Sequence, residues 1–494
     1  MIYWIAAALL VVGFVVLVRW FGLVERSQKV IAIARRSFGV IRSSSLSDEA
    51  KEALLQKDAR RLFKLFFLLA VGGAAAAGLP AGLLWMCDQF GWISFASVMH
   101  VALSPMFLIV SGFVALAVLF GGTKKPGRPA SDYSAVDRLL HRVAFRTTAA
   151  QTAVADLEDQ LFAKRLAACK ADRPVFITAL PRAGTTLLLE CLAELGPFAS
   201  HCYRDMPFVL IPCMWNRFAA RFCRDGRSRP RAHGDGMLIN FDSPEAFEEV
   251  LWKTFWRDHY RADRIEPWHD DEENAEFDEF FRNHMRKIVW LRRGEAPGAR
   301  YVSKNNLNVA RIGLLKRLFP DSVVLVPFRD PLQHAASLLR QHRNFLRIHG
   351  EDPFASEYMR AIGHFDFGEN LRPVDFDGWL DQRESTGPDS LAFWLEYWVA
   401  GYRHLLEENA DSVHFIGYEA LCEEAREGLH QVALAIDCHD EQTLMAIADT
   451  IHAPRPHDVD TSGVNSSLLQ ESRRLHERLQ EVALVRSPEM QPVG

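Results

Sequence analysis

The chain has 494 residues and a formal net charge of −5, from 57 basic and 62 acidic side chains; 49% of its residues are hydrophobic and 24% are charged. This composition excludes a disordered chain, a collagen and a coiled coil, and the near-neutral charge gives no support for a nucleic-acid-binding protein. The long uncharged apolar runs lie before Gly122, whereas the rest of the chain is polar and charged. The sequence therefore predicts a membrane anchor followed by one large soluble domain.

Three apolar segments predict transmembrane helices. Residues 2–24 supply the roughly 20 apolar residues that a bilayer core requires, and the first basic side chain is Arg19. Because no basic residue precedes this segment, it does not resemble a cleaved signal peptide. Residues 65–87 and 93–120 are the second and third predicted spans, and their short connection makes 65–121 a hairpin. The alternative is that one span is a buried core helix or lies in the membrane interface.

Basic residues near the ends of these spans predict the orientation. They concentrate in residues 25–64 and directly after the third span, and the opposite ends carry none. The positive-inside rule then places 25–64, a basic helical loop, in the cytoplasm. Residues 122–170, a linker and connecting helix, and the domain at 171–494 follow on the same side. The eight cysteines include no C-x-x-C pair, which agrees with a reducing compartment. We expect an integral protein of the bacterial inner membrane.

Within the soluble domain, short β-branched runs alternate with helical patterns. The clearest units are a strand at 175–180 with a helix at 185–195, a strand at 323–328 with a helix at 332–340, and a strand at 413–416 after a helix at 391–406. Such alternation predicts an α/β fold with a parallel sheet flanked by helices. Residues 206–300 lack this alternation, and we interpret them as an insertion on the acceptor side.

A phosphate-binding loop is predicted directly after the first strand. Residues 181–186 read Pro-Arg-Ala-Gly-Thr-Thr, so a strand meets a glycine-containing turn and then opens a helix with two hydroxyl residues. Backbone NH groups and the positive end of the helix then point at one position, which suits an anion such as a phosphate. The alternative is that Thr185 serves merely as a helix N-cap. A Walker A loop is absent, which disfavours Mg-ATP chemistry.

The string PRAGTTLL resembles the 5′-phosphosulfate loop of sulfotransferases that use 3′-phosphoadenosine-5′-phosphosulfate (PAPS). Residues 323–339 are similar to that family's 3′-phosphate element, with Arg329 after a strand and Ser337 eight residues later. A strand ending in Lys304 and a later strand ending in Tyr418-Glu419 also match, in the family's order. The matches span 175–421 and leave the membrane region and about 206–300 uncovered. Ala183 departs from the family pattern, where serine is usual.

This resemblance implies a P-loop-like α/β fold and sulfuryl transfer from PAPS, which leaves as PAP, without an obligatory metal. The 5′-phosphosulfate would be held by the loop residues Pro181, Arg182, Ala183, Gly184, Thr185 and Thr186. Arg329 and Ser337 would bind the 3′-phosphate. Lys304 would neutralise charge on the leaving oxygen, since sulfuryl transfer, like phosphoryl transfer, depends on in-line positioning and charge stabilisation.

A general base must accept the proton of the attacking hydroxyl. In the resembled family this group is a carboxylate soon after the first helix or, in its cytosolic branch, a histidine. The stretch after the predicted first helix contains both His201 and Asp205, of which Asp205 is favoured. The alternative for Asp205 is a structural role, either in the turn before Pro207 or in an ion pair with Arg204.

The sequence therefore predicts a membrane-anchored sulfotransferase that transfers a sulfuryl group from PAPS to a hydroxyl, or an amine, of a membrane-proximal acceptor. A carbohydrate or lipid-linked acceptor is expected from the membrane placement alone. The alternatives are a nucleotide phosphotransferase that uses the same loop and a non-catalytic membrane scaffold that binds nucleotide. Acceptor identity and oligomeric state do not follow from the sequence.

Overall fold

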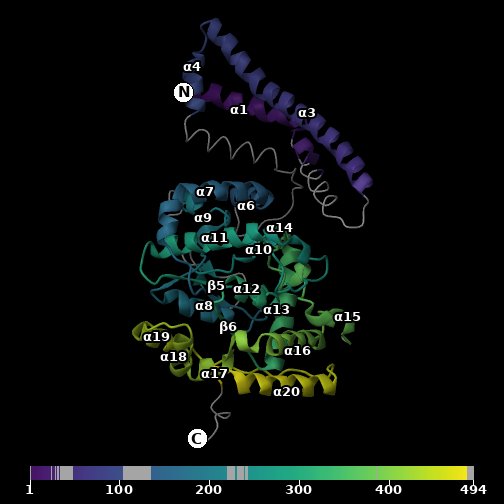
Figure 1. Cartoon of the computed structure of the whole chain (residues 1–494), viewed down its shortest axis with the longest axis vertical. Helices are drawn as coiled ribbons and strands as arrows, with labels where there is room; N and C mark the ends of the chain where they lie inside the picture. Colours follow the sequence, from purple (N-terminus) through teal and green to yellow (C-terminus); the bar gives the residue numbers. More distant parts are fainter. Residues whose placement is uncertain are drawn as a thin grey trace. The chain divides into compact units, whose positions relative to one another are not determined.

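The structure is a computed structural model that describes residues 2–23, 25–27, 29–30, 33, 48–103, 135–219, 229–230, 238–239, 243–384 and 387–486. The chain forms two compact units, Met1–Val143 and Ala144–Gly494. Figure 1 shows the elements of both units in chain order.

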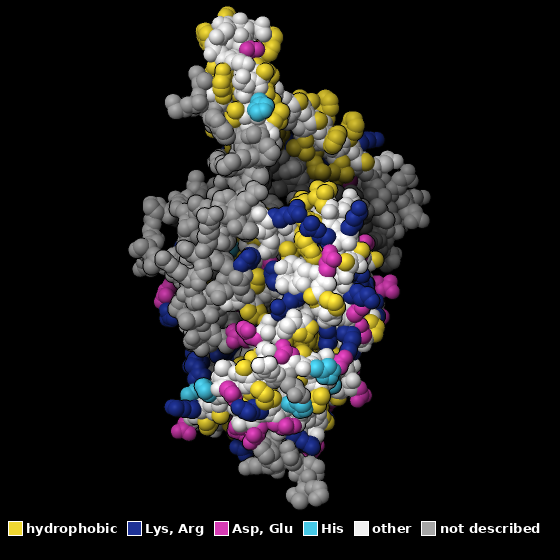
Figure 2. All heavy atoms as spheres, turned by 90° about the vertical axis from the view of Figure 1, so that its left-hand side faces the viewer, with side chains coloured by type: hydrophobic (Ala, Val, Ile, Leu, Met, Phe, Trp, Pro, Cys, Tyr) yellow, Lys and Arg dark blue, Asp and Glu magenta, His cyan; other side chains and the backbone are white. Residues whose placement is uncertain are grey.

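The first unit contains three apolar helices in its described part: α1 (Ile2–Trp20), α3 (Asp48–Gln89) and α4 (Phe95–Ala102). α1 packs along α3 at small residues, since a Cβ on Gly13 would lie 3.2 Å from Pro80 and the Leu23 side chain reaches Gly72. Large apolar side chains such as Phe63 remain exposed along α3, and Figure 2 shows hydrophobic side chains gathered on these helices. Exposed apolar faces of this extent are typical of helices that contact lipid or a partner.

Among the described residues, one helical stretch, Gln56–Gln89, is long and apolar enough to cross a membrane, and only 11% of its most apolar window is buried. The apolar part of α1, Leu9–Trp20, is shorter. The third predicted span runs mostly through 104–120, outside the described residues, as do the predicted linker from 121 to 131 and much of the basic loop. Three transmembrane helices are therefore not confirmed. α3 also runs without interruption from the predicted basic loop into the second predicted span.

Two helices that the sequence pattern merged into one lie at the boundary of the two units and at the start of the second. α6 (Ala135–Arg146) and α7 (Thr148–Ala168) are separated at Thr147. α7 packs on α11 (Ala275–Arg293), where the buried Lys287 amino group lies 2.9 Å from Glu158 Oε2 and 2.5 Å from Asp159 Oδ1. Because a buried ammonium without a counter-charge would be very costly, these contacts fix α7 to α11.

A five-stranded parallel sheet organises this unit, with the strand order β2-β5-β1-β6-β7. Its strands are β1 (Val175–Ile177), β2 (Phe198–Ala199), β5 (Arg300–Lys304), β6 (Val323–Phe328) and β7 (His414–Gly417). β1 is the central strand. After β1 the chain continues to β2 and β5 on one side of it, and after β5 it crosses to β6 and β7 on the other side. Ligands in such α/β sheets bind beyond the carboxyl ends of the strands at this kind of switch point.

The sheet is buried on both faces, and alternating side chains of each strand enter two different cores. Val175 and Ile177 pack with α8 (Thr185–Glu194) and α18 (Ala425–Ala435), whereas Phe176 points to the face covered by α11, α12 (Ile312–Leu318) and α16 (Leu391–Glu408). Both kinds of position are fully buried. This double burial explains why the strands read as continuous apolar runs.

The remaining helices and strands lie around this sheet. They are α9 (Pro212–Ala219), β3 (Arg229–Pro230), β4 (Leu238–Ile239), α10 (Glu249–Phe255), α13 (Pro331–Glu351), α14 (Pro353–Ala361), α15 (Trp379–Gln382), α17 (Tyr418–Glu423), α19 (Glu441–Ala448) and α20 (Ser466–Val482).

The predicted α/β fold is confirmed, with a parallel sheet flanked by helices. The first strand is shorter than predicted, because the chain leaves the sheet after Ile177 to form the loop, and the helix predicted at 332–340 continues to Glu351. Within 206–300, the acidic residues between Asp270 and Glu279 precede α11 and form its first turns. Asn274 is the N-cap and accepts a hydrogen bond from the Phe277 NH. The acidic side chains in the first turn interact favourably with the positive end of the helix dipole.

Candidate active site

The loop predicted to bind phosphate leaves the central strand at the carboxyl edge of the sheet. Arg182 and Gly184 both have positive φ angles, 73° and 107°, and Gly184 is the N-cap of α8. Thr185 is therefore the first residue of the helix and not its cap. The free NH groups of this first turn face the loop, so the local geometry is that of an anion-binding helix N-terminus.

Gly184 is required at its position for two reasons. Its φ of 107° is strained for any residue with a Cβ, and a Cβ there would lie 2.3 Å from Cδ2 of Tyr418. Tyr418 opens α17 directly after β7, so its ring covers the loop from the neighbouring side of the sheet. Burial raises the pKa of Tyr418 to about 12, which keeps its hydroxyl protonated at neutral pH.

The end of β5 lies beside the loop on the other side. Lys304 is the register partner of Ile177, the last residue of β1. Two residues later, Asn306 accepts hydrogen bonds from both sides of the loop, from Thr178 Oγ1 to its carbonyl at 3.2 Å and from Thr185 Oγ1 to its Oδ1 at 3.3 Å. The structure thus brings Lys304 and the loop together at one edge of the sheet.

Arg329 follows β6 and reaches the same loop. Its Nη1 donates to the Arg182 carbonyl at 3.4 Å, its Nε lies 3.3 Å from Glu419 Oε1, and its guanidinium stacks 4.8 Å from the centre of the Tyr418 ring. Burial raises the pKa of Glu419 although the Arg329 charge opposes this. The partners of Arg329 lie in the segments that follow the two neighbouring strands, β1 and β7. Its position is therefore set before any ligand binds.

α13 carries the second residue of the predicted 3′-phosphate element and also supports the loop. Asp330 caps this helix, accepting from the Gln333 NH at 2.9 Å, and Pro331 is its first residue. One turn later, His334 Nε2 lies 2.8 Å from the Pro181 carbonyl, and burial lowers the pKa of His334 to about 3. His334 is therefore neutral and donates to the loop. Ser337 lies one turn further along and is 6% exposed.

The structure places the two candidates for the general base together, beyond the carboxyl end of β2. His201 Nδ1 lies 3.5 Å from Asp205 Oδ2, and the His201 ring stacks on His284 of α11 with centroids 5.0 Å apart. Both oxygens of Asp205 lie 2.5 Å from Arg292 Nη2, and Asn216 Nδ2 donates to Oδ1 at 3.0 Å. Neither His201 nor Asp205 is more than 1% exposed.

These contacts determine the charge of Asp205. Burial alone would raise its pKa, but the hydrogen bond from His201 and the charge of Arg292 hold the pKa of Asp205 well below its ordinary value. A fully enclosed carboxylate that pairs with an arginine matches the structural alternative for this residue, with Arg292 rather than Arg204 as partner. Its role as the base stays a prediction that substitution can test.

Sequence reasoning missed a buried polar network beside β5. Glu249 accepts a hydrogen bond from Asn305 Nδ2 at 2.8 Å and pairs with Arg311, whose guanidinium lies 3.9 Å from the Trp252 ring. The adjacent Glu248 accepts from the Tyr301 hydroxyl at 3.1 Å. Through Asn305 and Arg311, the network holds the segment that follows Lys304 in place. Its acidic residues lie in 206–300, where no motif marked them.

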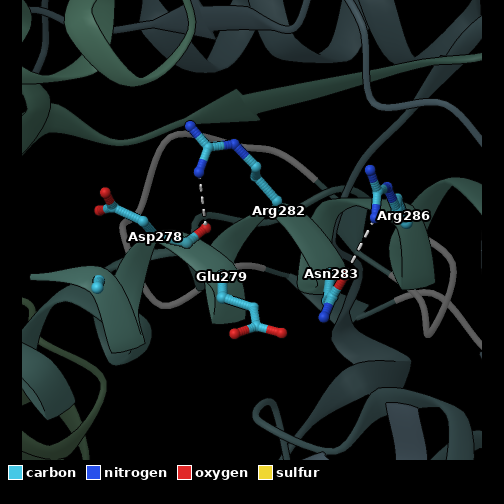
Figure 3. Close-up of a pocket in the computed structure, with 6 residues that line it drawn as sticks. Asp278, Glu279, Arg282, Asn283 and Arg286 are labelled. Atoms are coloured by element: carbon cyan, nitrogen blue, oxygen red, sulfur yellow. Dashed lines mark hydrogen bonds between the residues drawn. The ribbon is translucent and has the colours of Figure 1, made fainter. Parts of the chain in front are cut away.

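Two surface pockets lie away from the loop. The larger, of about 440 Å³, lies along α11 and is lined by Asp278, Glu279, Arg282, Asn283, Arg286 and Ala275 (Figure 3). An adjoining pocket shares Arg282 and Arg286 and includes Asp172 and Asp321. Because these two aspartates precede β1 and β6, that pocket lies at the amino ends of the strands, opposite the loop. In Figure 3, Arg282 donates to the backbone carbonyl of Asp278, and Arg286 donates to the side-chain oxygen of Asn283.

Part of the α/β unit is similar to a known protein family. Residues 174–366 match the model of the sulfotransferase family. Similar solved structures include sulfotransferase STF9 from Mycobacterium avium, with 15% identity, a TM-score of 0.38 and coverage of 75% of this chain and 88% of that chain. Sulfotransferase STF1 from Mycobacterium tuberculosis H37Rv has 11% identity, a TM-score of 0.33 and coverage of 76% and 85%. No curated protein sequence matches the chain.

The fold and the family match support an α/β transferase. The matched segment runs from just before β1 into the region after α14 and includes the loop, Lys304, Arg329 and Ser337. The match to the sulfotransferase family over residues 174–366 confirms the resemblance seen in the motifs.

Proposed function

We propose that the protein transfers a sulfuryl group from PAPS to a hydroxyl, or an amine, of an acceptor close to a membrane. The observation that carries this proposal is the convergence of the loop 181–186, Lys304 and Arg329 at the carboxyl edge of one parallel sheet. Three strands deliver an anion cradle and two cations to one place. A donor with phosphate and sulfate groups at one end and a 3′-phosphate suits this arrangement.

The proposed roles follow from position. Thr185 and Thr186, with the NH groups after Gly184, bind the 5′-phosphosulfate through hydrogen bonds to its oxygens. Arg329 and Ser337, on the strand end and helix next to the loop, bind the 3′-phosphate. Lys304, beside the last residue of β1, stabilises negative charge as it develops on the bridging oxygen of the leaving PAP. No metal ion takes part in these roles.

The direct test is formation of PAP from PAPS by the purified full chain, with and without Mg²⁺, and calorimetry with PAP and ATP. We expect PAP to bind more tightly than ATP and sulfuryl transfer to proceed in the presence of EDTA. Magnesium-dependent turnover of ATP without PAP binding would establish a phosphotransferase instead. PAP binding without transfer to any acceptor or to water would indicate a scaffold.

The membrane part of the proposal rests on α3 and the exposed apolar side chains of the first unit. We propose three spans, at 2–24, 65–87 and 93–120, in a bacterial inner membrane with the sulfotransferase domain in the cytoplasm. An acceptor that is lipid-linked, or a carbohydrate held at the membrane, would then be within reach of a donor supplied from the cytosol.

Protease protection tests this orientation. In right-side-out vesicles the α/β unit should resist added protease, whereas inverted vesicles should expose it. Digestion from the outside would refute the cytoplasmic placement but would leave the proposed chemistry intact.

A further inference from the structure

Asn306 connects the loop to a carboxylate that the mechanism has not yet used. Its side-chain oxygen accepts from Thr185 of the loop at 3.3 Å, and its Nδ2 donates to Asp366 Oδ2 at 3.1 Å. Asp366 is therefore two hydrogen bonds away from the first turn of α8, on the side of the loop where β5 ends in Lys304. Since Lys304 is proposed to stabilise the leaving oxygen, we expect the sulfuryl group of a bound donor on this side.

The segment that carries Asp366 is held firmly. Phe365 is 2% exposed, and the NH groups of Gly368 and Glu369 donate to Nδ1 of His342 and His349 at 3.1 and 3.2 Å. These two histidines lie two turns apart on α13. Because the flanking residues are fixed, the Asp366 carboxylate has a defined position relative to the loop.

Exposure distinguishes Asp366 from Asp205 and Glu249. The Asp366 side chain is 11% exposed, whereas Asp205 is 0% and the Glu249 side chain 5% exposed. Asp205 and Glu249 also each pair with an arginine, through Arg292 and Arg311. The charged partner of Asp366 is His364, whose Nε2 lies 3.6 Å from Asp366 Oδ2. Asp366 can thus meet an acceptor without breaking an arginine ion pair.

We propose that Asp366, rather than Asp205 or His201, is the general base that accepts the proton of the acceptor hydroxyl, and that Asn306 and His364 position it. This inference rests on the proposed function. In the step, the acceptor oxygen transfers its proton to Asp366 and forms a bond to sulfur. The bond between sulfur and the bridging oxygen breaks, and its electron pair leaves with PAP. The protonated Asp366 then returns its proton to water, so atoms and charge balance.

The experiment uses the full chain in a hydroxyl-free detergent and compares two reactions. The first is PAP release from PAPS with octyl glucoside as acceptor, in which an alcohol or water must lose a proton. The second is release of 4-nitrophenolate from 4-nitrophenyl sulfate with PAP, in which the leaving phenolate needs no proton. Asp366→Asn should slow the first reaction about 100-fold or more, the usual scale of general-base catalysis, and the second less than about 5-fold. PAP affinity should stay within a few-fold.

Glu369→Gln is the matched control, because it removes an exposed carboxylate from the same segment and should leave both reactions unchanged. Asp366→Glu keeps the carboxylate and should recover part of the first reaction, with an acidic limb in its pH-rate profile that Asp366→Asn lacks. Unchanged PAP release in Asp366→Asn, or equal losses in both reactions, would overturn the assignment. If the unmodified chain neither binds PAP nor releases it from PAPS, the proposed function itself fails, and that result is distinct from either of these.

Discussion

Replacement of Gly184 by alanine tests whether the loop is as crowded as the structure shows. At φ 107° an L-residue is strained by about 1–3 kcal/mol, and the new Cβ would lie 2.3 Å from the Tyr418 ring, which adds about 1–3 kcal/mol of overpacking. The free energy of unfolding should therefore fall by about 2–6 kcal/mol. For a domain of this size, each kcal/mol lowers the Tm by about 2 °C, so we expect a loss of about 4–12 °C.

Thermal unfolding of the full chain in detergent measures this loss, and two further variants identify its cause. Gly298→Ala has a similar positive φ, 74°, but nothing lies within 4 Å of its Cβ, so only the backbone strain of about 1–2 kcal/mol applies. The double variant Gly184→Ala with Tyr418→Ala removes the clash and should show a favourable coupling of about 1–3 kcal/mol. Equal losses for Gly184→Ala and Gly298→Ala, or no coupling with Tyr418→Ala, would refute the close contact. PAP affinity should fall in Gly184→Ala, because the displaced ring borders the anion cradle.

Three other predictions address the donor site and its pH dependence. Arg329→Ala should weaken PAP by about 1.5–3 kcal/mol in calorimetry but should affect adenosine 5′-phosphosulfate, which lacks the 3′-phosphate, much less; equal losses would remove Arg329 from the 3′-phosphate site. Lys304→Ala should retain PAP affinity within a few-fold and lose about 100-fold in turnover, whereas Thr186→Ala should lose PAP affinity first; unchanged turnover in Lys304→Ala would contradict its role. Since the pKa of His334 is lowered to about 3, this side chain stays unprotonated in the folded chain, whereas in the unfolded chain it takes up a proton below about pH 6.5. Its contribution to the free energy of unfolding is therefore complete above pH 6.5, and about 2 kcal/mol of it is lost by pH 5. Urea unfolding at both pH values should show a smaller difference in His334→Gln, and an equal difference would exclude His334 as the source.

The sequence was informative where structure is local. Strand, loop and helix follow one another within residues 175–194, so the positive φ at Gly184 and the helix start could be predicted from the motif. The family resemblance implied that Lys304 and Arg329 meet the loop. The parallel sheet explains this meeting, because the carboxyl ends of parallel strands share one edge. The family's motif order supplied the rest.

Contacts between distant segments could not be predicted in this way. Asp205 looked like a base by its place in the chain, but its partner Arg292 lies 87 residues later on a helix that the sequence pattern did not reveal. The contact from Asn306 to Asp366 spans 60 residues and belongs to no motif. Such pairings depend on how α11 and the segment after α14 pack, and packing against a sheet leaves no fixed spacing in the sequence.

α13 connects the two parts of the proposed reaction centre. At 1.5 Å per residue its 21 residues form a rod of about 30 Å. Near one end, His334 supports the loop that is proposed to bind the donor, and towards the other, His342 and His349 support the segment that carries Asp366. A tilt of this rod therefore moves both halves of the centre together. If donor binding shifts α13 and so changes the affinity for the acceptor, thermodynamic linkage requires that the acceptor change the affinity for the donor by the same factor.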